Sequence, residues 1–174
     1  MTGSGITPPQ RVLLVEDDPG DVFLVQELLA EVDPALEVVP VASVAEAVSA
    51  DLLRGSDCVL LDLNLPGSQG LDGLRQVLHA HGAAAVCVLT GLDDEHLAVA
   101  AVAAGAQDYL VKGKVDGQVL IRAVRYAVER RRAESSLLRL REEELAAAES
   151  ARLERGLLPS PLLAGSPVHA RSFY

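Results

Sequence analysis

The chain has 174 residues, 49% of them hydrophobic, and a formal net charge of −10. Its length suits one domain with an extension, and the lack of tryptophan, with only two phenylalanines and three tyrosines, predicts an aliphatic core. The acidic balance argues against general nucleic-acid binding, and no apolar run reaches the roughly 18 residues that a membrane span needs.

Short apolar runs alternate with segments of helical spacing along most of the chain. The runs lack polar alternation, which is typical of strands buried on both faces of a parallel sheet. We expect strands at residues 11–15, 36–42, 57–63, 84–90 and 108–111, and helices at residues 21–31, 44–53, 71–80, 94–104 and from 116 onward. This order predicts an α/β fold with a doubly wound parallel sheet and helices on both faces.

Polar side chains follow four of the five predicted strands. Glu16 and Asp17 end the first run, Asp62 the third, Thr90 the fourth and Lys112 the fifth, whereas the second run ends on nothing reactive. In open parallel sheets, ligands bind beyond the carboxyl ends of the strands, so these side chains are expected to meet at one edge.

The residue types at this edge suit phosphoryl transfer. Three close carboxylates, on Glu16, Asp17 and Asp62, repel one another, and Mg²⁺ would relieve the repulsion because it prefers a few carboxylates, a carbonyl and several waters. No cysteine or histidine lies in these motifs, which argues against zinc. Lys112 and Thr90 can stabilise anionic oxygens, and Asp62, alone at the end of the middle strand, is the expected nucleophile.

Each of these residues also has a purely structural interpretation. Asp17, Asp18 or Asp21 can cap the following helix, and the last two are the preferred caps. Asp62 can cap the turn before "LPGSQG". The hydroxyl of Thr90 can bond to backbone, and Lys112 can face solvent. Their joint occurrence at one edge, in this order, favours the functional interpretation.

The two cysteines, Cys58 and Cys87, both lie in apolar runs. We expect two reduced core thiols of a cytoplasmic protein and no disulfide framework. The opening segment "MTGSGITPPQ", residues 1–10, has neither the basic nor the apolar region of a signal peptide and is expected to be flexible.

Four separated stretches, "LLVEDDPGD", "LLDLNLPGSQGLDGL", "VLTG" and "DYLVKG", resemble the receiver domain of bacterial two-component response regulators. The resemblance covers residues 11–130 and implies a CheY-like (flavodoxin-like) (βα)₅ fold with sheet order 2-1-3-4-5. It implies that Asp62 takes a phosphoryl group from a phosphohistidine on a histidine kinase or a histidine phosphotransfer protein. It also implies that Asp17 binds Mg²⁺ directly, Glu16 through water, and Asn64 through its backbone carbonyl.

The same resemblance assigns a switch to the end of the sheet. It makes Thr90 the switch hydroxyl, Lys112 the invariant cation and Tyr109 the switch aromatic, which turns inward when Thr90 moves toward the phosphoryl group. The alternative for Tyr109 is a half-buried strand tyrosine. The family usually has proline after the lysine, whereas this chain has Gly113. Because a cis bond without proline costs about 2.5–4 kcal/mol, we expect a trans bond, with glycine supplying unusual dihedral angles.

The helix that opens near residue 116 is expected to continue to residue 156, because helix formers dominate and no proline occurs. At about 1.5 Å per residue such a helix reaches about 60 Å, longer than a small domain. Its first part, to about Val128, should pack on the sheet, and residues 131–156 should form a projecting linker. The "RRR" and "EEEL" runs are expected to be a solvated face.

A thin heptad seam runs along this linker. Leu138, Leu145 and Ala148 form the seam and Arg141 interrupts it. The seam favours a parallel two-helix coiled coil and therefore a homodimer; a lone or disordered extension is the alternative.

Residues 157–174 contain prolines that break the helix. The stretch "ARLERGLLPSPLLAGSPVHARSFY", residues 151–174, resembles the opening of SpoIIE/RsbU-like PP2C-type serine/threonine phosphatases, without any of that family's metal-binding aspartates. The resemblance implies an effector of this class, whose catalytic domain does not fit within the chain.

The leading hypothesis is a Mg²⁺-dependent phosphorelay receiver, not itself an enzyme, that controls an attached or associated effector without nucleic-acid or membrane partners. A phosphohydrolase of the haloacid dehalogenase type is a second hypothesis, but Asp62-Leu63-Asn64-Leu65 lacks that family's second aspartate and its following threonine or valine. A third is a degenerate receiver that only binds partners, and the intact set of strand-end residues argues against it.

Overall fold

The structure is a computed structural model that describes residues 10–80, 84–91 and 94–157. The chain divides into two compact units, residues 1–136 and residues 137–174, which are described separately. The predictions for residues 1–9 and for the proline-containing tail from residue 158 onward lie outside the described residues.

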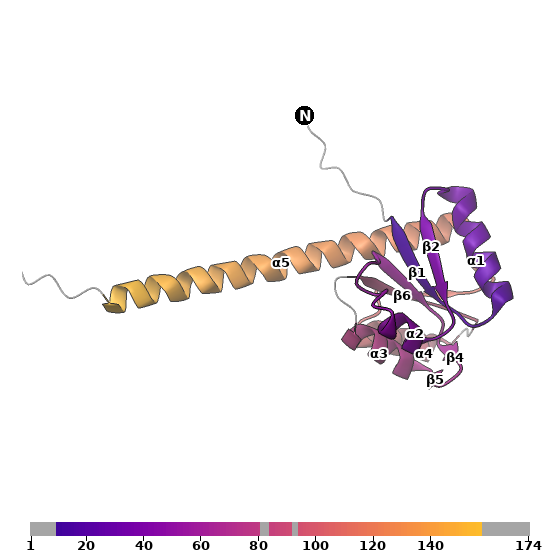
Figure 1. Cartoon of the computed structure of the whole chain (residues 1–174), viewed down its shortest axis with the longest axis horizontal. Helices are drawn as coiled ribbons and strands as arrows, with labels where there is room; N and C mark the ends of the chain where they lie inside the picture. The colour runs from indigo at the N-terminus through magenta and orange to yellow at the C-terminus, as the bar shows by residue number, and fades with distance from the viewer. Residues whose placement is uncertain (1–9, 81–83, 92–93, 158–174) are drawn as a thin grey trace, which may run out of the picture. The chain divides into compact units, whose positions relative to one another are not determined.

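A five-stranded parallel sheet forms the centre of the first unit (Figure 1). Its strands are β1 (Arg11–Val15), β2 (Glu37–Val41), β3 (Cys58–Leu61), β6 (Ala85–Thr90) and β7 (Asp108–Val111). They lie in the order β2-β1-β3-β6-β7, which is 2-1-3-4-5 among the strands of this sheet. The predicted fold class and sheet order are therefore confirmed.

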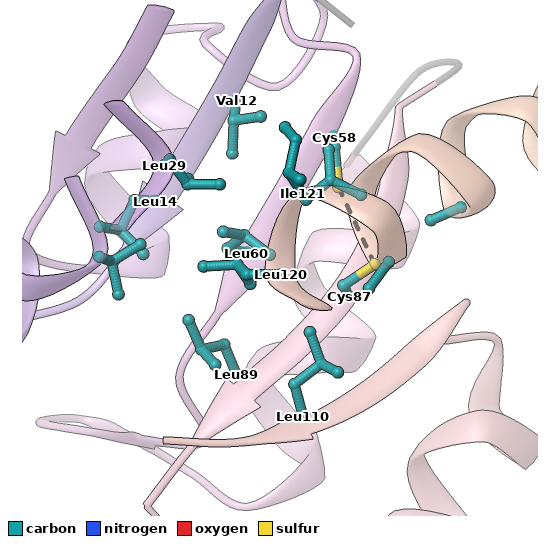
Figure 2. Packing of buried hydrophobic residues seen from close by; sticks show 14 of the residues in the cluster. Val12, Leu14, Leu29, Cys58, Leu60, Cys87, Leu89, Leu110, Leu120 and Ile121 are labelled. Atoms are coloured by element: carbon teal, nitrogen blue, oxygen red, sulfur yellow. Dashed lines mark hydrogen bonds between the residues drawn. The ribbon is translucent and has the colours of Figure 1, made fainter. Parts of the chain in front are cut away.

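The described residues form five helices. They are α1 (Pro19–Val32), α2 (Val44–Ser49), α3 (Leu71–Ala80), α4 (Glu95–Ala104) and α5 (Gly117–Leu157). Two buried clusters divide the core between the faces of the sheet: one joins the strands to α1 and α5, the other joins them to α2, α3 and α4. Figure 2 shows the first cluster, in which Leu29 of α1 and Leu120 and Ile121 of α5 pack against strand residues such as Leu14 and Leu60. Aliphatic side chains supply nearly all of this packing, as the composition predicts.

Two local features differ from the sequence prediction. Helix α2 ends at Ser49, four residues before the predicted end, because Asp51 takes a left-handed φ of 52° and stops the helix. After β3 the chain forms a small antiparallel hairpin, β4 (Asn64–Leu65) and β5 (Ser68–Gln69), which was not predicted. Pro66 and Gly67 make its turn, and Gly67 has a φ of 80°, which suits the second central position of a type II turn.

The "RRR" run is partly solvated, as predicted, since Arg130 is exposed and the Arg132 side chain is 39% exposed, but it also makes contacts that were not predicted. Arg132 Nη2 donates to Asp57 Oδ1 over 3.0 Å, and Arg130 Nη2 donates to the carbonyl oxygen of Gln107. The other carboxylate oxygen of Asp57 accepts the backbone N–H groups of Gln10 and Arg11, at 2.9 and 3.2 Å. Gln10, Asp57 and Gln107 directly precede β1, β3 and β7, so the two arginines bind α5 to the amino ends of the strands. We call this group of contacts the arginine clasp.

The prediction of two core thiols is confirmed. Cys58 and Cys87 are fully buried free thiols on neighbouring strands, and their sulfur atoms lie 3.9 Å apart (Figure 2). The hydrogen bond to Cys87, together with burial, raises the pKa of the Cys58 thiol well above its usual value. The thiol form is therefore the stable one.

Helix α5 begins in the first unit and continues through the second. Val128 is the last buried hydrophobic residue of the helix among those whose burial the structure describes, as predicted. In the second unit, Leu137, Leu138, Leu140, Leu145 and Leu153 are all more than half exposed. Among the described residues, no helix combines the length and apolar character that crossing a membrane requires.

Candidate functional site

The parallel register brings the predicted residues to the carboxyl edge of the sheet. The backbone N–H of Asp62 donates to the carbonyl of Val15, so the end of β3 lies beside Glu16 and the end of β1. The backbone N–H of Lys112 donates in the same way to the carbonyl of Thr90, which joins the ends of β6 and β7.

Lys112 lies at the centre of this edge. Its ammonium group contacts three carboxylates: Asp21 Oδ2 at 2.7 Å, Asp62 Oδ2 at 2.8 Å and Glu16 Oε2. Burial alone would lower the pKa of Lys112, but its hydrogen bonds to Asp21, Asp62 and Glu16 outweigh burial and raise the pKa strongly. Lys112 is therefore a fixed positive charge among the acids.

Glu16 is the most deeply buried of these acids, with a side chain only 2% exposed. Its Oε1 accepts the backbone N–H of Asp18 at 3.1 Å, and its Oε2 contacts Lys112. Burial raises the pKa of Glu16, and the contacts with Lys112 and Asp18 offset this only in part. The carboxylate of Glu16 is thus held in one place by both of its oxygens.

Asp62 combines burial with three hydrogen-bond donors. Its side chain is 8% exposed; Oδ1 accepts the backbone N–H of Asn64 at 3.1 Å, and Oδ2 accepts Lys112. Burial raises the pKa of Asp62. The hydrogen bonds from Lys112, from the Asn64 N–H and from the Thr90 hydroxyl lower the pKa by more than burial raises it, so the net shift is downward. Asp62 is therefore held as an oriented carboxylate, the form that a nucleophile requires.

The three aspartates that follow β1 have different positions. Asp17 is exposed and lies with Glu16 along a groove that Pro19 and Phe23 also line. Asp18 caps α1, because its Oδ1 accepts the N–H groups of Gly20 and Asp21 at 2.7 and 3.1 Å. The prediction that Asp18 or Asp21 caps this helix is confirmed for Asp18.

Asp21 also belongs to this edge of the sheet, which the sequence does not predict. Its position predicts only a helix cap, whereas its carboxylate contacts Lys112. The signal available in the sequence was its place in the first turn of α1, directly after the acidic strand end.

The donor set at this edge fits a hard divalent cation. Three carboxylates, those of Glu16, Asp21 and Asp62, contact a single ammonium group, and Asp17 directly follows Glu16 along the chain, so the edge keeps a negative charge. Within the described part of the chain no group of three or more acidic, histidine or cysteine side chains forms a ready metal cage. Mg²⁺ does not require one, because it keeps several waters and uses one or two carboxylates.

The remaining predicted residues lie near this centre. Asn64 is exposed at the start of the β4–β5 hairpin, directly after the two residues that follow β3. Thr90 is fully buried, and Tyr109 is half-buried on β7, opposite Val88 and against the second core cluster. Gly113 has a φ of 77°, and none of the described peptide bonds is cis, as predicted.

Residues 12–125 match the response regulator receiver domain. The chain is 35% identical to the nitrate/nitrite response regulator protein NarP of Escherichia coli, over 81% of this chain and 66% of that protein. It is 32% identical to protein-glutamate methylesterase/protein-glutamine glutaminase 1 of Cereibacter sphaeroides, over 98% of this chain and 43% of that protein. The chain thus spans about a quarter to two thirds of the length of the curated relatives it matches.

Solved structures agree with these relatives. NtrX from Brucella abortus aligns with a TM-score of 0.65 and 26% identity, over 77% of this chain and 30% of that one. The beryllofluoride-activated receiver domain of RstA from Klebsiella pneumoniae aligns with a TM-score of 0.59 and 28% identity, over 68% of this chain and 97% of that one. With the matched segment covering well over half of the sequence, the chain belongs to the response regulator receiver domain family.

Proposed function

We propose that Asp62 is the phosphoacceptor of this receiver and that a histidine kinase or a histidine phosphotransfer protein is its donor. The observation that carries the proposal is the environment of the Asp62 carboxylate, which is buried and ionised beside Lys112 and Thr90. In the transfer, a carboxylate oxygen of Asp62 forms a bond to phosphorus while the phosphorus–nitrogen bond breaks, and the electron pair of that bond stays on the imidazole, which is then protonated.

The other residues of the edge have supporting roles in this proposal. Lys112 neutralises charge on the phosphoryl oxygens, and the hydroxyl of Thr90 donates to one of them. Glu16, Asp17, Asp62 and the backbone carbonyl of Asn64 would hold Mg²⁺, which supplies additional neutralisation of the transferring oxygens when bound.

Movement of Thr90 toward the phosphoryl group is the proposed switch, and Tyr109 is the residue that responds. Thr90 is fully buried, so its movement must be accompanied by repacking of its surroundings. Tyr109 is half-buried on the neighbouring strand and can accommodate such a change.

The output of the switch is proposed to pass through α5 to an effector. We propose a PP2C-type serine/threonine phosphatase, which rests only on the sequence of residues 151–174. The names of the relatives show other outputs: NarP is a response regulator protein, DctD from Pseudomonas aeruginosa is a transcriptional regulatory protein, and the Cereibacter sphaeroides protein is a methylesterase. The receiver itself is proposed to have no catalytic activity beyond loss of its own phosphoryl group.

Radiolabelled acetyl phosphate with Mg²⁺ tests the phosphoacceptor. We expect Mg²⁺-dependent label on the wild type and on the matched control Asp18→Asn, and none on Asp62→Asn. Label that persists on Asp62→Asn would contradict the assignment, and absence of label from the wild type would favour the degenerate receiver. Steady turnover of p-nitrophenyl phosphate would favour the phosphohydrolase.

The exposed leucines of the second unit support a dimer through α5. A thin seam of Leu138, Leu145 and Ala148 can pair with the same seam of a second copy in a parallel coiled coil. Sedimentation with and without beryllofluoride tests this proposal, which requires a dimer in at least one state.

A further inference from the structure

Phosphoryl transfer to Asp62 leaves one contact at the edge unexplained. Asp21 Oδ2 lies 2.7 Å from Lys112 Nζ, slightly nearer than Asp62 Oδ2 at 2.8 Å. Asp21 belongs to α1 and not to any strand end, and Asp18 already caps that helix. The contact therefore needs a reason other than helix capping.

The hydrogen-bonding capacity of Lys112 is fully used in this structure. An ammonium group has three N–H donors, and Lys112 meets three carboxylates, those of Glu16, Asp21 and Asp62. A phosphoryl oxygen on Asp62 can receive a hydrogen bond from Lys112 only if one of these partners is released.

Exposure decides which partner can leave. The side chain of Glu16 is 2% exposed, and releasing it would leave a buried carboxylate without its cation, which is costly. Asp62 carries the phosphoryl group and stays in place. The side chain of Asp21 is 41% exposed, so water can solvate its carboxylate after release at little cost.

We propose that Asp21 is a positioning residue, which holds the Lys112 ammonium group in the unphosphorylated protein and releases it to the phosphoryl group. This inference rests on the proposed function. Asp21 competes with the phosphoryl group for a hydrogen bond, and its negative charge also repels the phosphoryl oxygens. Both effects favour the unphosphorylated state, so loss of the carboxylate should favour the phosphorylated one.

Calorimetric titration of the full chain with beryllofluoride at saturating Mg²⁺ tests the proposal. Asp21→Asn keeps the size of the side chain and removes its charge, and we expect roughly two- to five-fold tighter binding than in the wild type, the size expected for a half-exposed ion pair. Asp18→Asn is the matched control: it removes one carboxylate from the same edge without a contact to Lys112, and asparagine still caps a helix. We expect its affinity to equal that of the wild type.

Asp21→Glu restores the charge and should return the affinity for beryllofluoride toward the wild-type value. The midpoints of urea unfolding of Asp21→Asn, Asp18→Asn and Asp21→Glu should all equal that of the wild type. Equal affinities for Asp21→Asn and Asp18→Asn would overturn the role of Asp21 while leaving Asp62 as phosphoacceptor. A wild type that neither binds beryllofluoride nor takes label on Asp62 would overturn both proposals.

Discussion

The two ends of the sheet present opposite arrangements of charge. At the carboxyl end, one ammonium group, that of Lys112, is surrounded by acids. At the amino end, one carboxylate, that of Asp57, is surrounded by donors: two backbone N–H groups and the guanidinium of Arg132. At the amino end the charge of Asp57 is balanced by the guanidinium of Arg132, whereas the carboxyl end keeps excess negative charge. This difference separates a structural contact from a site that still needs cations.

The largest expected effect comes from removing the cation of the carboxyl end. Lys112→Met leaves the buried carboxylates of Glu16 and Asp62 without their counter-charge, and we expect loss of labelling by acetyl phosphate and about 2–4 kcal/mol lower free energy of unfolding. Without the lysine, burial raises the pKa values of these carboxylates in the folded variant, so they take up protons as the pH falls from about 7 to about 5.5. The difference in free energy of unfolding between the variant and the wild type should therefore shrink over this range. Urea unfolding at both pH values measures this, and an equal deficit at each would argue against the uncompensated charge.

A second prediction concerns the close approach of α5 to α1. A methyl group on Gly117 would lie 2.3 Å from the carbonyl oxygen of Leu28 and 3.0 Å from Val32 Cγ2, so α1 and α5 must move apart to accept it. We expect Gly117→Ala to lower the free energy of unfolding by about 1–3 kcal/mol, although alanine is the better helix former. Increased stability in urea unfolding would show that the two helices do not approach this closely.

Breaking the arginine clasp should have a smaller effect, confined to stability. Asp57→Ala leaves the N–H groups of Gln10 and Arg11 without their carboxylate acceptor, and we expect a loss of about 1–2 kcal/mol. Labelling of Asp62 should continue at the wild-type rate. A slower rate would mean that the two ends of the sheet are coupled.

The smallest effect provides the baseline for these comparisons. Arg139 and Glu143 form an exposed pair on α5, with a 3.7 Å separation and side chains 73% and 65% exposed. Glu143→Gln is expected to change the free energy of unfolding by less than about 0.5 kcal/mol. A change as large as that of Asp57→Ala would remove the distinction between the clasp and an ordinary surface ion pair.

The sequence predicted the sheet because its apolar runs have a clear pattern, and it predicted the ends of elements less well. Helix α2 keeps helical spacing as far as Leu52, yet the helix stops at Ser49. The signal for the stop, a left-handed Asp51, is a property of the backbone that residue types alone do not reveal. The β4–β5 hairpin was missed for a related reason, since strands of two residues show no periodicity.

The side chains that follow the strands could be predicted from the sequence as members of the site. The contacts that helix residues make with the sheet ends could not. Glu16, Asp62, Thr90 and Lys112 follow apolar runs, and the parallel sheet then brings them to one edge. Asp21 reaches Lys112 only through the packing of α1 on the sheet, across 91 positions of sequence. The same limit applies to the contacts of Arg132, since a basic run on a helix looks identical whether it meets solvent alone or also contacts the amino end of a sheet.

The paired sulfur atoms in the middle of the sheet make this chain convenient for spectroscopic probes. Cys58 and Cys87 are the only cysteines of the sequence, and neither is accessible in the folded state. A cysteine introduced at an exposed position such as Leu145 would then be the one thiol that a maleimide spin label reaches. Distances between such labels would report whether the α5 helices of two copies pair, with both native cysteines left in place.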